Sequence, residues 1–253
     1  MLDDHDILVE VVVRPRHAYV RLPDMRVIER PGWFQLVTPS FREGGFNEVH
    51  ATLDEADADR VIAETIAEYA ALGIKFRWTV GPHSAPADLA ARLARAGLRR
   101  TDALGMVLPV PCEIEVPPPR AGVEVVRVDA SNVDDFNLVE SAGWGRDPAP
   151  FRVANEVMLA SPAQHMYLAL VDGEPAATAK GVQFERSMYL MGGVVRDSFR
   201  GRGVYRALVE ARVVDASRLG LEVVTAHALV DTSAPMLAHL GFTTACSFAS
   251  FRN

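Results

Sequence analysis

The stretch that most limits how this chain can fold is VVRDSFRGRGVYRALVEAR, residues 194–212. An apolar strand ends there in a cluster of arginines and glycines, and an amphipathic helix begins at once. The first turn of a helix presents free N–H groups and the positive end of the helix dipole, so it suits an anion. Two glycines let a phosphate approach the backbone, and four arginines add positive charge. These residues are Gly201, Gly203, Arg196, Arg200, Arg202 and Arg206. We therefore predict a pyrophosphate site.

Two other phosphate-binding loops do not fit this stretch. The dinucleotide pattern G-x-G-x-x-G needs a third glycine where Arg206 stands, and an acidic residue at the end of the next strand. Glu222 stands at the beginning of that strand instead. The nucleotide-hydrolase pattern G-x-x-x-x-G-K-[ST] is absent from the sequence. A glycine-rich turn with solvated arginines remains the alternative to an anion site.

The second half of the chain alternates strands and helices, which predicts an α/β fold. Asp172-Gly173 predicts a tight hairpin turn, Ser131 a helix cap and Gly220 a helix end. The predicted strands are 123–128, 165–171, 175–184, 188–195, 221–229 and 247–251, and the predicted helices begin near 133, 151, 204 and 234.

The first half closes with the same order of elements. Thr52 and Glu55 have capping-box spacing for a helix that runs to about Leu72. A strand (74–80), a second helix (86–96) and a strand after Gly97 follow, which indicates an internal duplication. Five prolines in residues 109–122 predict a stiff linker between the halves. We therefore expect domains at 1–111 and 122–253, joined by a linker at 112–121.

The strand, loop and helix at residues 188–218 resemble the acyl-CoA site of the GNAT superfamily of N-acyltransferases, whose loop reads R-x-x-G-x-G/A. The late Leu240-Gly241-Phe242 after a short helix is similar to that family as well. The resemblance implies two GNAT-like domains, each a mixed, mostly antiparallel splayed sheet flanked by helices. It also implies acetyl-CoA as acyl donor, with its pantetheine arm between the strand ending at Val195 and the strand 223–229. Backbone groups of Val194, Val195 and Arg196 would pair with that arm. Amides of Arg200, Gly201, Arg202, Gly203, Val204 and Tyr205 would hold the pyrophosphate.

The sequence departs from the family at positions that matter for the chemistry. Tyr205 stands where the family has glycine or alanine, and Leu237 where it often has a tyrosine acid. The strand 187–193 carries no glutamate base. We therefore predict His227, on a strand that flanks the thioester, as the group that removes the proton from the amine. Tyr205 is the next candidate, as an acid for the departing thiolate.

The loop at residues 143–150 resembles the acceptor loop of the family, which implies that it receives the acceptor. Trp144 there is predicted to pack an apolar substrate, or alternatively to anchor the loop. Glu140 and Asp147 lie near the same loop and would attract a cationic amine, although most such carboxylates are simply solvated.

The first half lacks the glycine loop. At the matching junction stands HATLDEADAD, residues 50–59, whose acidic side chains would repel a pyrophosphate. This half is predicted to be a degenerate copy.

Charge and cysteine content narrow the possible partners. A net charge of −7 argues against nucleic acid, two cysteines are too few for a disulfide framework, and the histidines lack metal-ligand spacing. The acidic N-terminus and the lack of a long apolar run predict a cytoplasmic protein without membrane contact. We expect an N-acetyltransferase that moves acetyl from acetyl-CoA to a primary amine of a small molecule or peptide in a ternary complex, without metal. The alternative is a catalytically silent acyl-CoA-binding regulatory protein. The oligomeric state and the acceptor's identity are left open.

Overall fold

The computed structural model describes residues 2–110 and 122–253, which form two compact units. Unit 1 contains Met1–Val20, Met106–His227 and Pro235–Ala245. Unit 2 contains Arg21–Gly105, Ala228–Ala234 and Cys246–Asn253. The N-terminal segment thus belongs with the second half of the chain, and the C-terminal segment with the first. The predicted linker at 112–121 lies outside the described residues.

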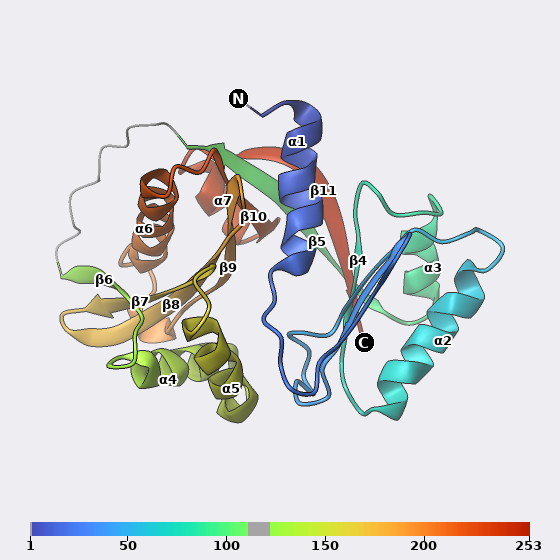
Figure 1. Ribbon diagram of the computed structural model, residues 1–253, viewed down its shortest axis with the longest axis horizontal. Coiled ribbons are helices and arrows are strands. Elements are labelled where there is room, and N and C mark those ends of the chain that lie inside the picture. The colour runs from blue at the N-terminus through green and yellow to red at the C-terminus, as the bar shows by residue number, and fades with distance from the viewer. Residues whose placement is uncertain (1, 111–121) are drawn as a thin grey trace. The chain divides into compact units, whose positions relative to one another are not determined.

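Unit 1 has a mixed sheet in which neighbouring strands are antiparallel except for one parallel pair. Its strands lie in the order β10-β9-β8-β7-β6, and only β9 and β10 are parallel. Helices α4 and α5 cover one side of this sheet and α6 covers the other (Figure 1). The elements are β6 (Val123–Arg127), α4 (Val133–Trp144), α5 (Pro148–Leu159), β7 (Gln164–Val171), β8 (Glu174–Gln183), β9 (Ser187–Val195), α6 (Val204–Arg218), β10 (Val223–Leu229) and α7 (Ser233–Ala238).

The N-terminal segment of unit 1 changes its helical pattern twice. It begins as α1 (Asp4–Leu8), continues as a π-helix, η1 (Val9–Val13), and ends as a 3₁₀-helix, η2 (Arg14–His17). Glu10, Val11 and Val12 are buried. Because buried residues need a surface to pack on, this segment is part of the unit 1 core and not a free tail.

Unit 2 repeats the pairing pattern of unit 1. Its strands lie in the order β1-β2-β3-β4-β11, and here only β3 and β4 are parallel. Its core packs Tyr69 flat on Phe76, with ring centroids 4.2 Å apart. The elements are β1 (Arg26–Arg30), β2 (Trp33–Val37), β3 (Glu48–Ala51), α2 (Ala58–Ala71), β4 (Arg77–Val80), α3 (Leu89–Arg95), β5 (Arg99–Pro109) and β11 (Thr243–Arg252), of which β5 and β11 run from one unit into the other. The expected mixed, mostly antiparallel sheets flanked by helices are confirmed.

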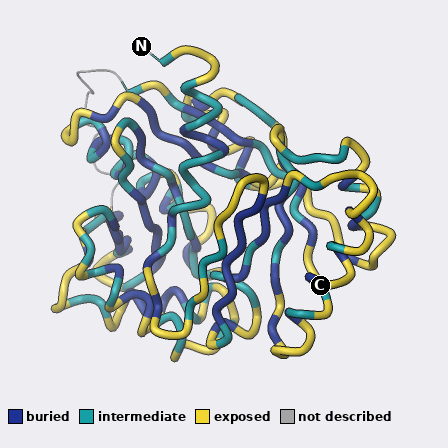
Figure 2. The backbone as a smooth tube through the Cα atoms, turned by 45° about the vertical axis from the view of Figure 1, so that its right-hand side comes forward, coloured by how far each residue is buried: buried dark blue, intermediate teal, exposed yellow. Residues whose placement is uncertain are grey.

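Local sequence patterns correctly predicted the turn between β7 and β8 and the buried face of α6. Asp172 and Gly173 both have positive φ, 53° and 84°, and join β7 to β8 as the predicted tight turn. The apolar face of α6, including Val204 and Leu208, packs on the sheet as its spacing predicts. In Figure 2 the strands are largely buried and the turns exposed.

Two predicted helix caps are wrong. Helix α2 begins at Ala58 with Asp57 as its N-cap residue, because the Thr52 hydroxyl donates to the carbonyl of His83 at 2.6 Å instead of capping a helix. Helix α4 is preceded by Asn132, since the hydroxyl of Ser131 donates to Asp129. Across residues 2–110 and 122–253, none of the helices has the length and apolar character that crossing a membrane requires.

Candidate active site

The parallel strands β9 and β10 stay together for only part of their length. They pair from Ser187 opposite Val223 to Leu190 opposite Ala226, and β9 then continues to Val195. On its other side β9 remains paired with β8 up to Val195, across an irregularity that includes Gly192 with φ of 65°. Within the described chain, residues 191–195 have no strand partner on the β10 side. We call this side the open edge of β9.

The glycine loop follows directly and ends in free N–H groups. Gly201 and Gly203 have φ of 75° and 76°, which favours glycine, and Gly203 precedes the first residue of α6. The N–H groups of residues 201–206 donate to no carbonyl in the part of the chain that the structure describes. Since the first N–H groups of a helix point out of its end, the loop has the donors that an anion needs.

The arginines of this loop already hold partners at the surface. Arg200 pairs with Asp197 at 2.8 Å and Arg202 with Asp172 at 2.8 Å, and all four side chains are largely exposed. Exposed pairs of this kind contribute about 0–1 kcal/mol, so a bound phosphate can replace them. In Arg196 the backbone also has partners: its N–H donates to the carbonyl of Ala176, and its carbonyl accepts from the N–H of Phe199. Its backbone groups are therefore engaged within the protein, unlike the backbone of the open edge.

His227 stands one residue beyond the last β10 residue that pairs with β9. Its Nε2 lies 2.7 Å from the carbonyl oxygen of Val11, and its ring meets the ring of Tyr189 edge-on at 5.2 Å. Thr225 is opposite Tyr189 in the strand register, so alternation puts Tyr189 and His227 on the same face of the sheet. This is also the face on which Lys180 of β8 meets α4.

Tyr205 lies on the opposite face. A Cβ atom on Gly193 would lie 3.1 Å from Cε2 of Tyr205, so the ring packs beneath this glycine of β9. Burial raises the pKa of Tyr205, while the charge of Arg212 lowers it. The structure thus puts the two predicted catalytic side chains on opposite faces of the sheet, both next to β9 or its neighbour.

Trp144 ends α4 beside the open edge. Gly143 packs so closely on Val194 that a Cβ there would lie 2.5 Å from Cγ2 of Val194. Trp144 itself is 43% exposed, and the guanidinium of Arg146 lies 5.9 Å from its ring centroid. Because the glycine lets the helix end approach β9, the next residue presents an accessible aromatic surface near the strand.

Sequence reasoning missed a buried charged network between α4 and β8. Lys180 lies opposite Met191 of β9, and its Nζ is 2.6 Å from Oε1 of Glu140. Asn155 donates to Oε2 of Glu140 at 2.7 Å. Glu140 is only 2% exposed, so the expected solvated carboxylate is wrong: it is held inside the fold by an ion pair. The signal was a single lysine inside the apolar strand PAATAKGVQ.

A second buried cation lies on the other side of β8. Arg212 of α6 is 1% exposed and donates to the carbonyls of Leu208 and Lys180. No carboxylate of the described residues lies within ion-pair distance of it. Burial lowers the pKa of Arg212 to about 10. The charges of Lys180 and Glu140 cancel, so Arg212 leaves a net positive charge beside β8, the strand next to β9.

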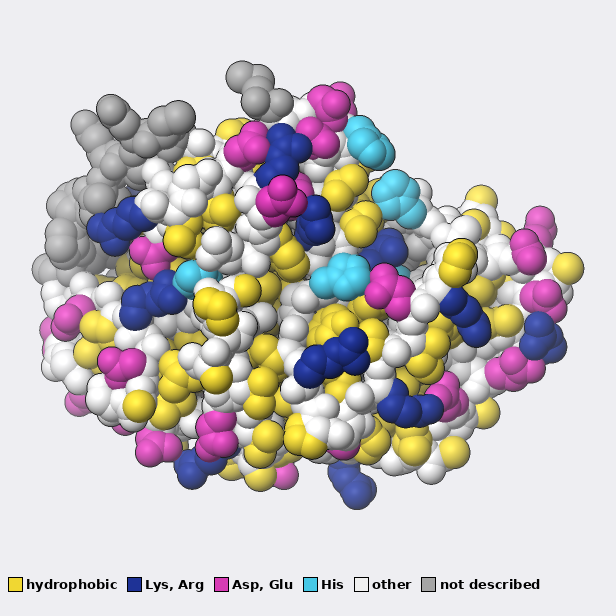
Figure 3. Space-filling view, in the orientation of Figure 1, with side chains coloured by type: hydrophobic (Ala, Val, Ile, Leu, Met, Phe, Trp, Pro, Cys, Tyr) yellow, Lys and Arg dark blue, Asp and Glu magenta, His cyan; other side chains and the backbone are white. Residues whose placement is uncertain are grey.

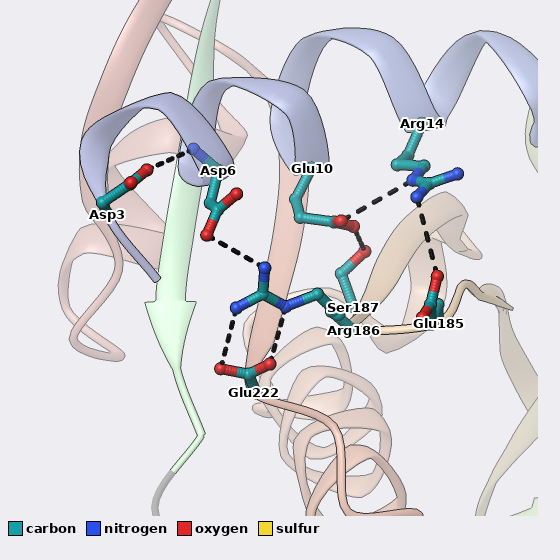
Figure 4. Close-up of polar contacts among 8 residues, drawn as sticks. All are labelled: Asp3, Asp6, Glu10, Arg14, Glu185, Arg186, Ser187 and Glu222. Carbon is teal, nitrogen blue, oxygen red and sulfur yellow. Dashed lines mark hydrogen bonds and ion pairs between the residues drawn. The ribbon is translucent and has the colours of Figure 1, made fainter. Parts of the chain in front are cut away.

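The N-terminal segment is fastened to the start of β9 by polar contacts (Figure 4). Arg186 pairs with Asp6 at 2.9 Å and with Glu222 at 2.7 Å. One residue on, the hydroxyl of Ser187 donates to the buried carboxylate of Glu10. Contacts 177 and 180 residues apart in sequence therefore tie the segment to unit 1.

Basic and acidic side chains are interspersed over the face of the molecule drawn in Figure 3.

The chain is similar to known proteins in sequence and in fold. Residues 132–242 match the model of the acetyltransferase (GNAT) family. No curated protein matches the chain. A GCN5-related N-acetyltransferase from Kribbella flavida has a similar fold, with a TM-score of 0.69 and 16% identity over 97% of this chain and 94% of that one.

Two further solved structures share the fold over most of their length. A functionally unknown conserved protein from Staphylococcus epidermidis ATCC 12228 gives a TM-score of 0.69 at 15% identity, covering 92% of this chain and 95% of that one. A tandem GNAT protein from the clavulanic acid biosynthesis pathway gives 0.63 at 15% identity, covering 98% and 87%. The open edge of β9, the glycine loop and α6 all fall within the matched segment. Residues 132–242 are therefore an acetyltransferase domain of the GNAT family.

Proposed function

We propose that this protein transfers an acetyl group from acetyl-CoA to a primary amine of a small molecule or peptide, directly and within a ternary complex. One observation carries the proposal: the open edge of β9 leads straight into the free N–H groups of residues 201–206. Acetyl-CoA has amide groups along its arm and a pyrophosphate at the far end, so it matches both in that order.

The donor's two parts have separate partners in this proposal. Backbone groups of Val194 and Val195 pair with the pantetheine amides as a further strand would. The amides of residues 201–205 and the side chains of Arg200 and Arg202 hold the pyrophosphate. Arg196, the third residue predicted to pair with the arm through its backbone, has partners within the protein for its N–H, its carbonyl and its side chain.

The chemistry follows from the two faces of the sheet. An acyl thioester between β9 and β10 would have His227 on one side and Tyr205 on the other. His227 accepts a proton from the amine, whose nitrogen then forms a bond to the carbonyl carbon. As the C–S bond breaks, Tyr205 gives its proton to the thiolate. Backbone N–H groups of the open edge stabilise the negative oxygen of the intermediate, and Trp144 packs against the acceptor.

The remaining assignments follow from the same reasoning. We assign the acyl-CoA site to unit 1, which holds most of the domain predicted at 122–253, and none to unit 2, which holds most of the degenerate copy predicted at 1–111. We also infer a cytoplasmic protein, because two cysteines do not make a disulfide framework.

A thiol-release assay across an amine library tests the function. With acetyl-CoA, the protein should release free CoA thiol only when a suitable amine is present, and mass spectrometry should show an acetylated amine. A folded protein that binds CoA but releases thiol with none of the amines would instead support the silent acyl-CoA-binding regulatory protein.

A further inference from the structure

The α6 side of the unit 1 sheet contains a buried positive charge that no carboxylate neutralises. Arg212 is only 1% exposed, and among the described residues its guanidinium bonds only to the carbonyl oxygens of Leu208 and Lys180, at 2.8 and 3.1 Å. Burying a charge without a counter-charge costs free energy. Since an apolar side chain of similar length would fill the same space, packing alone does not account for an arginine here.

Tyr205 and Arg212 lie under neighbouring strands of the sheet. They are about two turns apart on α6, so both face the sheet that this helix covers (Figure 1). A Cβ on Gly193 of β9 would lie 3.1 Å from Cε2 of Tyr205, and one on Gly181 of β8 would lie 3.8 Å from Cδ of Arg212. The buried charge is therefore next to the tyrosine that packs beneath the open edge of β9.

Two phenols lie near Arg212, and only one of them is already paired. Tyr167 donates its hydroxyl proton to Asp215 at 2.9 Å and accepts from Arg127. The hydroxyl of Tyr205 has no hydrogen-bond partner in the part of the chain that the structure describes. A negative charge on Tyr167 would be repelled by Asp215, whereas a negative charge on Tyr205 would be attracted by Arg212 without such opposition.

Other titratable groups on this face have their own partners. The pairs are His165 with Gln183, Arg127 and Tyr167 with Asp215, and Arg206 with Glu210. The residues that β8, β9 and β10 place on this face are uncharged, among them Ala177, Ala179, Gly193, Val195 and Ala226. Burial raises the pKa of Tyr205, and the charge of Arg212 is the nearby charge that lowers it.

We propose that Arg212 is a positioning residue for acetyl transfer: its buried charge stabilises the phenolate that Tyr205 becomes when it gives up its proton. As the C–S bond of the thioester breaks, the O–H bond of Tyr205 breaks and an S–H bond forms on the departing thiol. The phenolate then takes a proton from water. Opposite charges attract more strongly in the protein interior than in water, so the effect of Arg212 is larger there. The use of Tyr205 as the acid rests on the proposed function, whereas the coupling between the two side chains does not.

Fluorine NMR of the residue at position 205 tests the coupling without any substrate. A difluorinated tyrosine in place of Tyr205 ionises at lower pH than tyrosine, and its fluorine signal follows this phenol alone. Arg212→Met and Arg212→Gln remove the charge, so the pKa of the labelled phenol should rise in both. Arg212→Lys keeps the charge and should leave that pKa near the wild-type value. Arg218→Met, an exposed arginine at the end of the same helix, is the matched control and should change nothing.

Either neutral variant decides the question, provided that it folds. Replacing a buried ion by an apolar side chain is often neutral for stability, and glutamine can still donate to a carbonyl. Circular dichroism and urea denaturation identify the folded variants. An unchanged pKa of the labelled phenol in a folded Arg212→Met or Arg212→Gln protein would overturn the proposal.

Steady-state kinetics of the labelled protein test the use of this coupling. Arg212→Met should lower kcat by about tenfold and move the basic limb of the kcat–pH profile to higher pH, while the Kd for CoA stays within about twofold. Arg212→Lys should restore both kcat and the limb. A merely structural role would lower kcat without moving the limb, and that result would overturn the proposal. Failure of thiol release with every amine would overturn the proposed function instead, and would leave the fluorine result untouched.

Discussion

The two units contain the same junction, a pair of parallel strands followed by a helix, but only one is open. In unit 1 the residues after Leu190 leave their partner strand, and glycines with positive φ lead into α6. In unit 2 the strand edge that follows Ala51 is occupied by other residues of the same unit. Thr52 forms a parallel bridge with Ala85, and the N–H of Leu53 donates to Ala85 at 2.9 Å.

Charge separates the two junctions further. The turn before α2 carries Asp54, Glu55 and Asp57, whereas the turn before α6 carries arginines. Arg92 of α3 pairs with Asp59 in the first turn of α2 and with Asp88 just before α3. The comparison teaches that this strand arrangement does not by itself make an anion site. The edge must stay open, and the helix N-terminus must keep free donors with arginines beside them.

The largest effect is expected from Gly203→Glu. The carboxylate faces the proposed pyrophosphate, and a φ of 76° strains any side chain. Losing two charge-assisted hydrogen bonds, at about 1.5–3 kcal/mol each, weakens CoA binding by at least about 100-fold. Calorimetry should show this loss, and one site per chain in the wild type. Gly73→Glu in unit 2 is the control, since Gly73 has φ of 64° and open surroundings. Equal losses in both variants, or two sites per chain, would contradict the contrast between the junctions.

His227→Ala should lower kcat by about 10²–10⁴-fold, since a general base contributes on that scale. CoA affinity should change little because the loop is untouched. His83→Ala, an exposed histidine of unit 2, should have normal turnover. Normal kcat in His227→Ala would leave Tyr205 as the remaining candidate among the predicted catalytic groups.

The stability of unit 2 should depend on pH through the carboxyl group of Glu48. Burial raises the pKa of Glu48, but Arg77 and His50 outweigh it and hold the pKa well below its usual range. A lowered carboxyl pKa contributes stability above about pH 4.3, the unfolded value, and that stability is lost as pH falls through the folded pKa. Glu48→Gln should cost about 2–3 kcal/mol at pH 7 and flatten this acid limb in urea titrations. An unchanged acid limb would show that Glu48 is not the group responsible.

The smallest effect is expected from Thr52→Val, which removes the hydroxyl that donates to His83. The free energy of unfolding should fall by about 1 kcal/mol, measured by urea denaturation. No second CoA site should appear in calorimetry, because the backbone bond from Leu53 to Ala85 remains. A second site would mean that the Thr52 contact alone closes the junction.

Features decided by neighbours in sequence could be predicted, and features decided by distant residues could not. The Asp172-Gly173 turn and the glycine loop depend on local backbone preferences, so their residue types alone predict them. Thr52 has good capping-box spacing. Its hydroxyl nevertheless donates to His83, and its backbone pairs with Ala85, so it does not cap the helix. The pairing of Glu140 with Lys180 joins residues 40 apart. The contact of Val11 with His227 joins residues 216 apart and has no local signature.

The return of β11 to unit 2 has a consequence for synthesis on the ribosome. Ala249–Arg252 pair with Arg77–Val80, so β4 lacks this neighbour until the last strand has been made. At roughly 5–20 residues per second, that wait is about 10–30 s. Throughout it, the edge of a strand containing the otherwise fully buried Trp78 is available to other chains. The first unit to leave the ribosome is therefore the last to complete its sheet.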